Sequence, residues 1–305
     1  MTRGFDFIPS ILWHPHQGLW NLELMAHVTR LTRNQQEFEK VLTLIVRTDT
    51  FIRFFFAILE RMATLGPLAL YRKAAIPQGT EVLYLDLGTH EQGKELAFSI
   101  DRILGPIGGD VKAYGFEANQ QTHSRAVARF ASRPNVTIIR KALVFEVPPN
   151  GEIKLYKDQE KGLGDSLYRQ TAETEVVECC RLSEFLNSNK LLKPGQIRLL
   201  RMNIEGAEYD VVQDLVEAGM VKAIDGYFGM WDDVYKIDPP RDVEFRRLLR
   251  EQHIKSIPFN GRDMNWPPRQ RLITYHVHTR IMQAIRRIAK ERLAQKSLQP
   301  LSSPQ

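Results

Sequence analysis

Apolar and polar positions along most of the chain fall into alternating blocks. From residue 81 onward, short apolar runs of strand length are followed by glycine turns or by stretches with apolar positions at helical spacing. The predicted strands are residues 81–87, 111–116, 136–139, 152–156, 176–180, 197–204, 223–230, 256–259 and 272–277. The predicted helices are residues 96–104, 119–132, 182–187, 207–218, 243–253 and 281–293. This alternation predicts an α/β fold with a doubly wound, mainly parallel sheet that is covered on both faces.

The first part of the chain has a different pattern. Its apolar positions, such as Phe55 and Leu59, recur only at helical spacing. We therefore predict a helical accessory segment over residues 1–77, a main domain over 78–294 and a disordered tail over 295–305. The accessory segment is expected to pack against the main domain; covering a site or touching a membrane surface is the less favoured alternative.

Composition limits the classes of partner and compartment. The 305 residues include 42 basic and 36 acidic ones, which gives a net charge of +6. Because both signs are mixed, we expect no nucleic-acid partner. The two cysteines, Cys179 and Cys180, are adjacent, which excludes a disulfide framework and favours a reducing compartment. Without a secretory pattern or a span-length apolar stretch, the sequence predicts a cytoplasmic protein.

Two motifs follow the first two strands of the main domain. Asp86, Gly88 and Gly93 lie in a turn directly after the first strand, and Glu117 closes the second. A glycine at the carboxyl end of a strand lets the backbone turn sharply and approach a ligand closely. An acidic residue at the end of the next strand can accept hydrogen bonds from both ribose hydroxyls of an adenosine group. Together they predict a site for an adenosine-containing cofactor.

The spacing within the first turn bears on which cofactor is expected. A dinucleotide fingerprint has the form G-x-G-x-x-G, whereas four residues separate Gly88 from Gly93 here. S-adenosylmethionine has no pyrophosphate and carries a positive sulfonium, which suits the acidic residue Asp86. A nicotinamide-dependent oxidoreductase is therefore the less favoured alternative.

A third motif lies at the end of the predicted strand 197–204. In a doubly wound sheet this strand lies next to the first one, across the point where the strand order reverses. Asn203 and Glu205 would then lie at the mouth of the cofactor crevice. A plain strand-to-helix turn, in which Gly206 permits the bend, is the structural alternative.

With these motifs the chain resembles the FkbM-type methyltransferase family over about residues 80–218. The resemblance covers DLGTHEQG, GFEAN, NVTIIRKAL, GDSLY, VECCRLSEFL and MNIEGAEYDVV. It implies a class I (Rossmann-like) methyltransferase fold, S-adenosyl-L-methionine as the donor, and O-methylation of a sugar-like or small-molecule hydroxyl. The cofactor-binding residues that we expect are Asp86, Gly88, Thr89, His90, Glu117, Ala142 and Asn203. Among them the resemblance implies Asp86, Gly88 and Thr89 along the methionine moiety, Glu117 on the ribose and Ala142 near the adenine.

The sequence departs from the family at two places. Gly93 follows Asp86 by seven residues, where the family commonly has six, and Arg201-Met202-Asn203 stands where it commonly has Lys-Ile-Asp. These departures keep open the alternative of a non-catalytic cofactor-binding protein with a methyltransferase fold.

A general base is expected if the acceptor is a hydroxyl. Because an asparagine cannot act as a base, Glu205 is the favoured catalytic residue, with Asp232 or Asp233 as the next candidates and His90 as a further one.

The acceptor side of the site is defined only by class. We expect a small-molecule or glycan acceptor, on which Trp231 and Tyr235 could stack, although packing is the commoner role of such residues. The basic terminal helix is expected to be solvated, with a peripheral membrane contact as the alternative. The sequence does not specify an oligomeric state.

Two histidine pairs have the alternating spacing that some metal sites use. They are His14 with His16, and His276 with His278. No cluster of cysteines or carboxylates accompanies either pair, so we expect structural roles and no metal.

Overall fold

A computed structural model describes residues 76–158, 164–254, 256–258 and 266–298. The chain divides into two units, Met1–Leu70 and Tyr71–Gln305, and all the described residues belong to the second. The helices predicted within the first 75 residues, with His14 and His16, therefore lie outside the described residues. The same holds for the last seven residues of the predicted tail.

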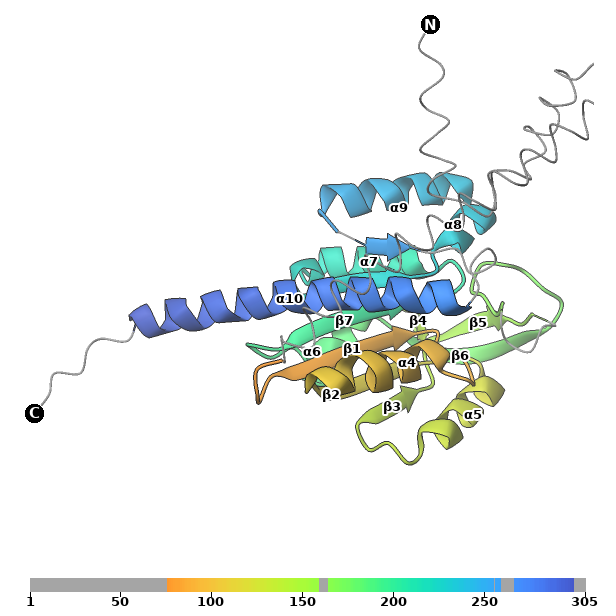
Figure 1. The fold of residues 1–305 in the computed structure, drawn as a ribbon. Coiled ribbons are helices and arrows are strands. Elements are labelled where there is room, and N and C mark those ends of the chain that lie inside the picture. Colours follow the sequence, from red (N-terminus) through yellow and green to blue (C-terminus); the bar gives the residue numbers. More distant parts are fainter. Residues whose placement is uncertain (1–75, 159–163, 255, 259–265, 299–305) are drawn as a thin grey trace, which may run out of the picture. The chain divides into compact units, whose positions relative to one another are not determined.

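In the part of the chain that the structure describes, six strands form a parallel sheet in the order β3-β2-β1-β7-β8-β9. Figure 1 labels β1, β2, β3 and β7 of this sheet. The strands are β1 (Glu81–Leu87), β2 (Asp110–Phe116), β3 (Val136–Ile139), β7 (Ile197–Met202), β8 (Gly226–Gly229) and β9 (Ser256–Pro258). The predicted parallel α/β architecture is confirmed. The strand order reverses between β1 and β7, which pair in parallel from Val82–Ile197 to Leu87–Met202. As predicted, the third motif follows the strand next to the first.

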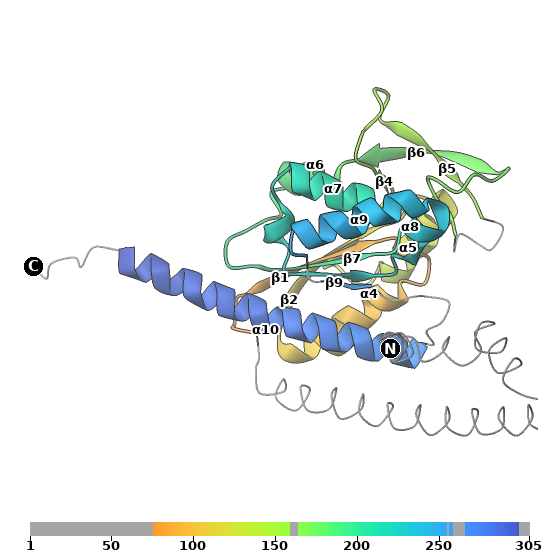
Figure 2. The same ribbon diagram turned by 90° about the horizontal axis from the view of Figure 1, so that it is seen from above.

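Alternate residues of the central strand face two separate apolar cores. Val82 and Tyr84 of β1 belong to one core, and Leu83 and Leu85 belong to the other. The helices divide in the same way between the two sides of the sheet (Figure 2). The first core is covered by α4 (Lys94–Phe98), the π-helical segment Ser99–Leu104, Phe130 of α5 (Gln120–Phe130) and α10 (Trp266–Leu298). The second is covered by α6 (Leu182–Ser188), α7 (Glu208–Glu217) and α9 (Pro239–Glu251).

A smaller sheet lies beside the parallel one. It contains β4 (Ala142–Leu143), β6 (Thr174–Cys180) and β5 (Glu152–Tyr156), with β5 antiparallel to β6. The two-residue strand β4 and the short helix α8 (Asp232–Ile237) were not predicted, because elements of this length carry too little periodicity.

The prediction of a strand at residues 272–277 is wrong, because these residues belong to α10. Isoleucine, threonine, tyrosine and valine in this stretch favour a strand locally. Over a longer window, however, buried apolar residues recur at helical spacing: Ile273, Val277, Ile281, Ala284 and Ile288. Burial of these residues against the sheet favours the helix over the strand. Among the described residues, no helix is both long and apolar enough to cross a membrane.

Candidate active site

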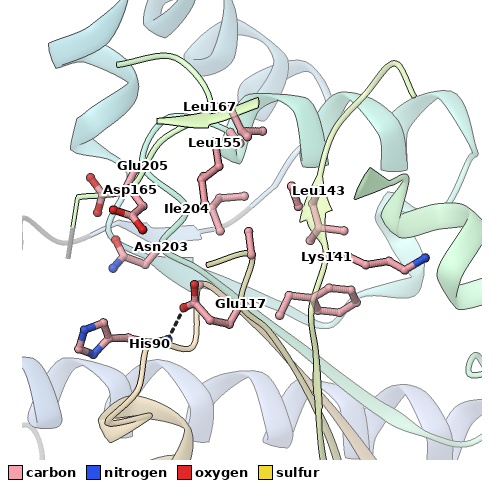
Figure 3. A pocket seen from close by; sticks show the side chains of 15 residues that line it. His90, Glu117, Lys141, Leu143, Leu155, Asp165, Leu167, Asn203, Ile204 and Glu205 are labelled. Atoms are coloured by element: carbon pink, nitrogen blue, oxygen red, sulfur yellow. Dashed lines mark hydrogen bonds between the residues drawn. The ribbon is translucent and has the colours of Figure 1, made fainter. Parts of the chain in front are cut away.

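A pocket opens at the carboxyl ends of β1, β2 and β7, where the strand order reverses (Figure 3). It encloses about 690 Å³ of empty space, part of which is open to solvent. Its lining consists of Gly88, His90, Phe116, Glu117, Ala118, Lys141, Ala142, Leu143, Leu155, Asp165, Leu167, Asn203, Ile204, Glu205 and Ala207. Six residues expected from the sequence line this pocket together: Gly88, His90, Glu117, Ala142, Asn203 and Glu205. Ligand sites in open parallel sheets occur at such a reversal point.

The first turn brings the ends of β1 and β7 into close contact. The backbone of Gly88 has a φ of +80°, and a Cβ atom there would lie 1.9 Å from the carbonyl oxygen of Asn203. The Gly88 N–H donates to the carbonyl of Phe116 at 2.9 Å. This turn therefore requires glycine both for its conformation and for its clearance.

Glu117 follows β2 and is fixed at the edge of the pocket. Its Oε2 accepts a hydrogen bond from the His90 backbone N–H at 2.9 Å, and its Oε1 accepts one from the Asn119 N–H at 3.1 Å. Each oxygen keeps a further lone pair, so the carboxylate is oriented and still able to accept from a ligand. Removal from water raises the pKa of Glu117 to about 7, against the two hydrogen bonds that lower it.

Asp86 and Thr89 are not part of the pocket lining. The Asp86 carboxylate is 1% exposed and lies 3.3 Å from Nη1 of Arg201, itself 2% exposed. The same Arg201 nitrogen donates to the carbonyl oxygen of Gly88 at 2.7 Å, and Thr89 Oγ1 donates to the Asp86 carbonyl at 3.0 Å. These residues support the turn from within the sheet.

Two polar atoms of the pocket lining are buried and have no hydrogen-bond partner among the described residues. They are Oδ1 of Asn203 and Nε2 of His90. Buried polar atoms in folded proteins are nearly always satisfied, so these two atoms indicate where a ligand supplies partners. Asn203 itself is fixed by its backbone N–H, which donates to the carbonyl of Leu87 at 2.9 Å.

Two residues with an unusual backbone conformation lie in the same place. Among the described residues, four that are not glycine have a positive φ: His90, Lys190, Glu205 and His253. Lys190 and His253 follow the ends of α6 and α9, where a left-handed residue is a common helix termination. His90 and Glu205 line the pocket instead. Such conformations persist only where the surroundings impose them, and they occur preferentially at functional sites.

Glu205 is the best-placed acidic candidate for a base. Its side chain is 14% exposed, and its carbonyl oxygen accepts a hydrogen bond from Ser166 Oγ at 2.7 Å. Burial, followed by the neighbouring carboxylates of Asp233 and Glu208, raises the pKa of Glu205 to about 8.

The other candidates for a base are less well placed. Asp233 is buried and lies 3.2 Å from the Lys236 ammonium, but it is not part of the pocket lining. Asp232 begins α8, and its side chain lies outside the described residues. His90 lines the pocket, with its backbone bound to Glu117.

Among the aromatic and histidine candidates, Trp231 and His276 are packed in the core, whereas Tyr235 is exposed. Trp231 is buried against Phe245, with 5.5 Å between ring centroids, and Tyr235 is 58% exposed. His276 is buried in α10 and packs against Phe228. Within the described residues there is no group of three or more histidine, cysteine, aspartate or glutamate side chains that could hold a metal ion.

Three contributors from the connection between β5 and β6 were not predicted from the sequence. Asp165 and Leu167 line the pocket from the connection between β5 and β6, and Arg169 of the same connection approaches Glu205. The GDSLY motif contributed to the resemblance, but nothing in its local pattern indicated which residues face the pocket. Arg201 was visible only as a basic residue within an apolar strand.

The family comparison agrees with this geometry. The family model described as the methyltransferase FkbM domain matches residues 86–226. The family expected from the sequence motifs is therefore confirmed for this part of the chain, which contains Gly88, Glu117 and Glu205. At the level of the family, the domain is a methyltransferase domain. No curated protein matches the chain.

Proposed function

We propose that the protein is an S-adenosylmethionine-dependent methyltransferase of the class I (Rossmann-like) fold that methylates a hydroxyl of a small-molecule or sugar-like acceptor. The observation that carries this proposal is the fixed Glu117 carboxylate beside the Gly88 turn, at the reversal point of the sheet. A carboxylate held at this point suits the two vicinal hydroxyls of a ribose.

The remaining lining residues fit the other parts of the cofactor. Phe116, Ala142 and Leu143 give an apolar wall suited to an adenine ring. Asn203 and His90 present the unpartnered polar atoms that an amino-acid head would satisfy. In their ionised form, the acidic side chains of the pocket favour a cationic ligand.

The chain's own residues account for binding, orientation and proton removal. When bound, the cofactor supplies a methyl group on a positively charged sulfur. The pocket walls hold the acceptor hydroxyl in place, and a fixed orientation contributes at best about 7–11 kcal/mol to lowering the barrier. An oxygen of Glu205 accepts the hydroxyl proton. A base whose pKa lies near the working pH accelerates such a step by about 10²–10⁴-fold.

Calorimetric titration with S-adenosylhomocysteine tests the donor site. Wild-type protein should bind it, and Glu117→Gln should bind about 10–100-fold more weakly because a charge-assisted hydrogen bond contributes roughly 1.5–3 kcal/mol. Glu244→Gln, on the exposed face of α9, is the matched control and should bind like the wild type. Absence of binding, or a preference for NADH, would overturn the proposal and leave only the α/β fold; a preference for NADH would in addition favour the oxidoreductase alternative.

Methyl transfer separates an enzyme from a non-catalytic binder of the same fold. Protein with a labelled donor should transfer label to members of a panel of glycan and small polyol acceptors, and Glu205→Gln should transfer at a rate lower by about 10²-fold or more. Tight product binding with no transfer across the panel would support the non-catalytic alternative. The cytoplasmic location and a peripheral membrane contact stay predictions.

A further inference from the structure

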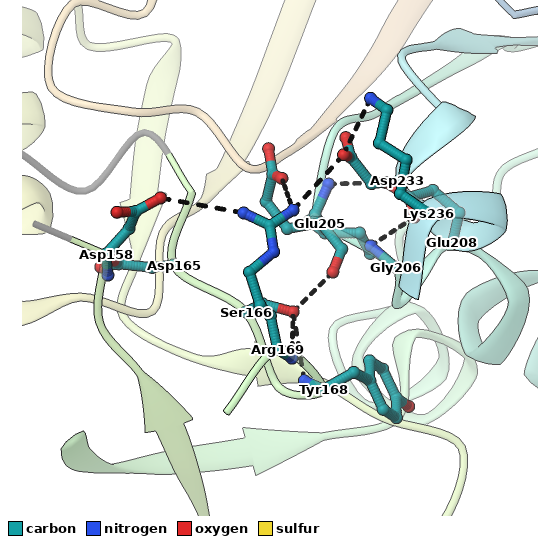
Figure 4. Close-up of polar contacts among 11 residues, drawn as sticks. Asp158, Asp165, Ser166, Tyr168, Arg169, Glu205, Gly206, Glu208, Asp233 and Lys236 are labelled. Carbon is teal, nitrogen blue, oxygen red and sulfur yellow. Dashed lines mark hydrogen bonds and ion pairs between the residues drawn. The ribbon is translucent and has the colours of Figure 1, made fainter. Parts of the chain in front are cut away.

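Arg169 lies among three carboxylates that come from separate parts of the chain (Figure 4). Its Nη2 is 3.5 Å from Asp233 Oδ1 and 3.7 Å from Glu205 Oε2, and its Nη1 is 3.8 Å from Asp158 Oδ2. Asp158 follows β5, Glu205 follows β7 and Asp233 belongs to α8. A single guanidinium therefore connects three separate segments at one end of the pocket.

The backbone around Arg169 is tied to the backbone of Glu205. The Ser166 hydroxyl donates to the Glu205 carbonyl at 2.7 Å and accepts from the N–H groups of Tyr168 and Arg169 at 3.1 and 3.2 Å. Glu205 has a φ of +51°, a conformation that a side-chain-bearing residue rarely adopts. Ser166 thus acts on the main chain of Glu205, while Arg169 acts on its carboxylate.

The carboxylates around Glu205 oppose its ionisation. Asp233 and Glu208 are both acidic, and Glu208 is fully buried with its oxygens bound to the N–H groups of Ile204 and Gly206. Lys236 is the second nearby cation, but its ammonium lies 3.2 Å from Asp233. Arg169 is therefore the cation that directly approaches the Glu205 carboxylate within the described site.

We propose that Arg169 is a positioning residue for Glu205: by bridging Glu205 to Asp233, its guanidinium favours the ionised form of the Glu205 carboxylate and keeps it directed into the pocket. Glu205 lines the pocket, whereas Arg169 and Asp233 are not among its lining residues, so Arg169 acts through Glu205. Arg169 would thereby set the fraction of Glu205 that is ionised and can accept a proton. This catalytic role rests on the proposed function, in which Glu205 is the base. An opposite charge at this distance lowers a carboxyl pKa by about 1–3 units.

Carbon NMR of the full chain, labelled at the glutamate carboxyl carbon, tests this directly without an acceptor. The Glu205 signal is identified by its loss in Glu205→Gln, and its titration midpoint is then followed in three variants. We expect Arg169→Met to raise the midpoint by about 1–3 pH units and Asp233→Asn to lower it. Arg169→Lys keeps the positive charge, so its midpoint should lie close to that of the wild type.

These outcomes separate an electrostatic role from a merely structural one. A variant that only loosened the fold would not produce shifts of opposite sign in Arg169→Met and Asp233→Asn, nor recovery with lysine. An unchanged Glu205 midpoint in both Arg169→Met and Asp233→Asn overturns the inference. Failure of wild-type protein to bind S-adenosylhomocysteine overturns the proposed function instead, and the NMR titration does not depend on that result.

Discussion

The guanidinium of Arg201 donates a hydrogen bond to the carbonyl oxygen of Gly88 at 2.7 Å, and thereby joins the end of β7 to the glycine turn after β1. The same guanidinium compensates the buried charge of Asp86. Removal of one partner of a buried ion pair leaves an uncompensated charge, which costs about 3–5 kcal/mol. One residue therefore couples the stability of the sheet to the shape of the turn.

We expect Arg201→Met to lower the free energy of unfolding by about 3–5 kcal/mol, measured by urea denaturation. The double variant Arg201→Met/Asp86→Asn should recover part of this loss, because the asparagine carries no charge. Arg247→Met removes exposed ion pairs on α9 and should change stability little. Equal effects of Arg201→Met and Arg247→Met would contradict the role of the buried pair.

Gly88 and Gly108 form a matched pair for testing the turn. Both have a φ of +80°, but a Cβ at Gly88 would overlap the Asn203 carbonyl, whereas nothing lies within 4 Å of one at Gly108. Gly108→Ala should therefore lower the free energy of unfolding only by the cost of a left-handed backbone conformation, about 1–2 kcal/mol in thermal or urea unfolding. Gly88→Ala should lower the free energy of unfolding by about 1–3 kcal/mol more than Gly108→Ala, and it should abolish S-adenosylhomocysteine binding. Similar losses for the two variants would show that clearance at Gly88 is unimportant.

Binding of S-adenosylhomocysteine should depend on pH through Glu117. The pKa of this carboxyl is raised to about 7, so its acceptor form becomes populated as the pH rises through neutrality. If only the ionised form accepts from the ligand, affinity should rise about tenfold between about pH 6 and pH 8. In Glu117→Gln the affinity should be nearly independent of pH over this range. A calorimetric series in which both proteins show the same slope would assign the dependence to another group.

The stability of the protein should fall as the pH rises from about 5 to about 8. The folded-state pKa values of Glu117 and Glu208 are raised to about 7 and that of Glu205 to about 8, from an ordinary 4.5. The folded state thus binds more protons than the unfolded state in this window, so their contribution is complete below pH 4.5 and is lost through pH 7–8. Glu205→Gln should flatten the curve and be more stable than the wild type at pH 8. Urea midpoints that increase with pH in the wild type would refute this.

Much of the sheet follows from local sequence pattern. The bounds of β1, β3 and β5 agree with the predicted strands because each is a mainly apolar or an alternating run between turn-forming residues. The position of β7 beside β1 followed from the topology of doubly wound sheets. The start of α10 did not follow, because its local residues favour a strand and only contacts with the sheet select the helix.

The site also contains residues that the sequence pattern predicts and residues that it does not. Gly88, Glu117, Asn203 and Glu205 were predictable because strand ends of a parallel sheet meet at one edge. The inward-facing Asp165 and the contact of Arg169 with Glu205 depend on how the connection between β5 and β6 folds back, which no periodicity encodes. Asp86 was expected along the cofactor; the structure places it beside Arg201, and ligand-binding measurements on Asp86→Asn are the remaining test of that expectation.

The walls of the pocket have two separate origins. The parallel sheet supplies Gly88 and Glu117, whereas the connection between β5 and β6 supplies Asp165 and Leu167. Insertions or exchanges in that connection can remodel one end of the cavity while the strand order and the glycine turn stay as they are. The pocket thus combines a part fixed by the sheet with a part that can vary. Related proteins that differ only in this connection can bind different ligands on the same sheet.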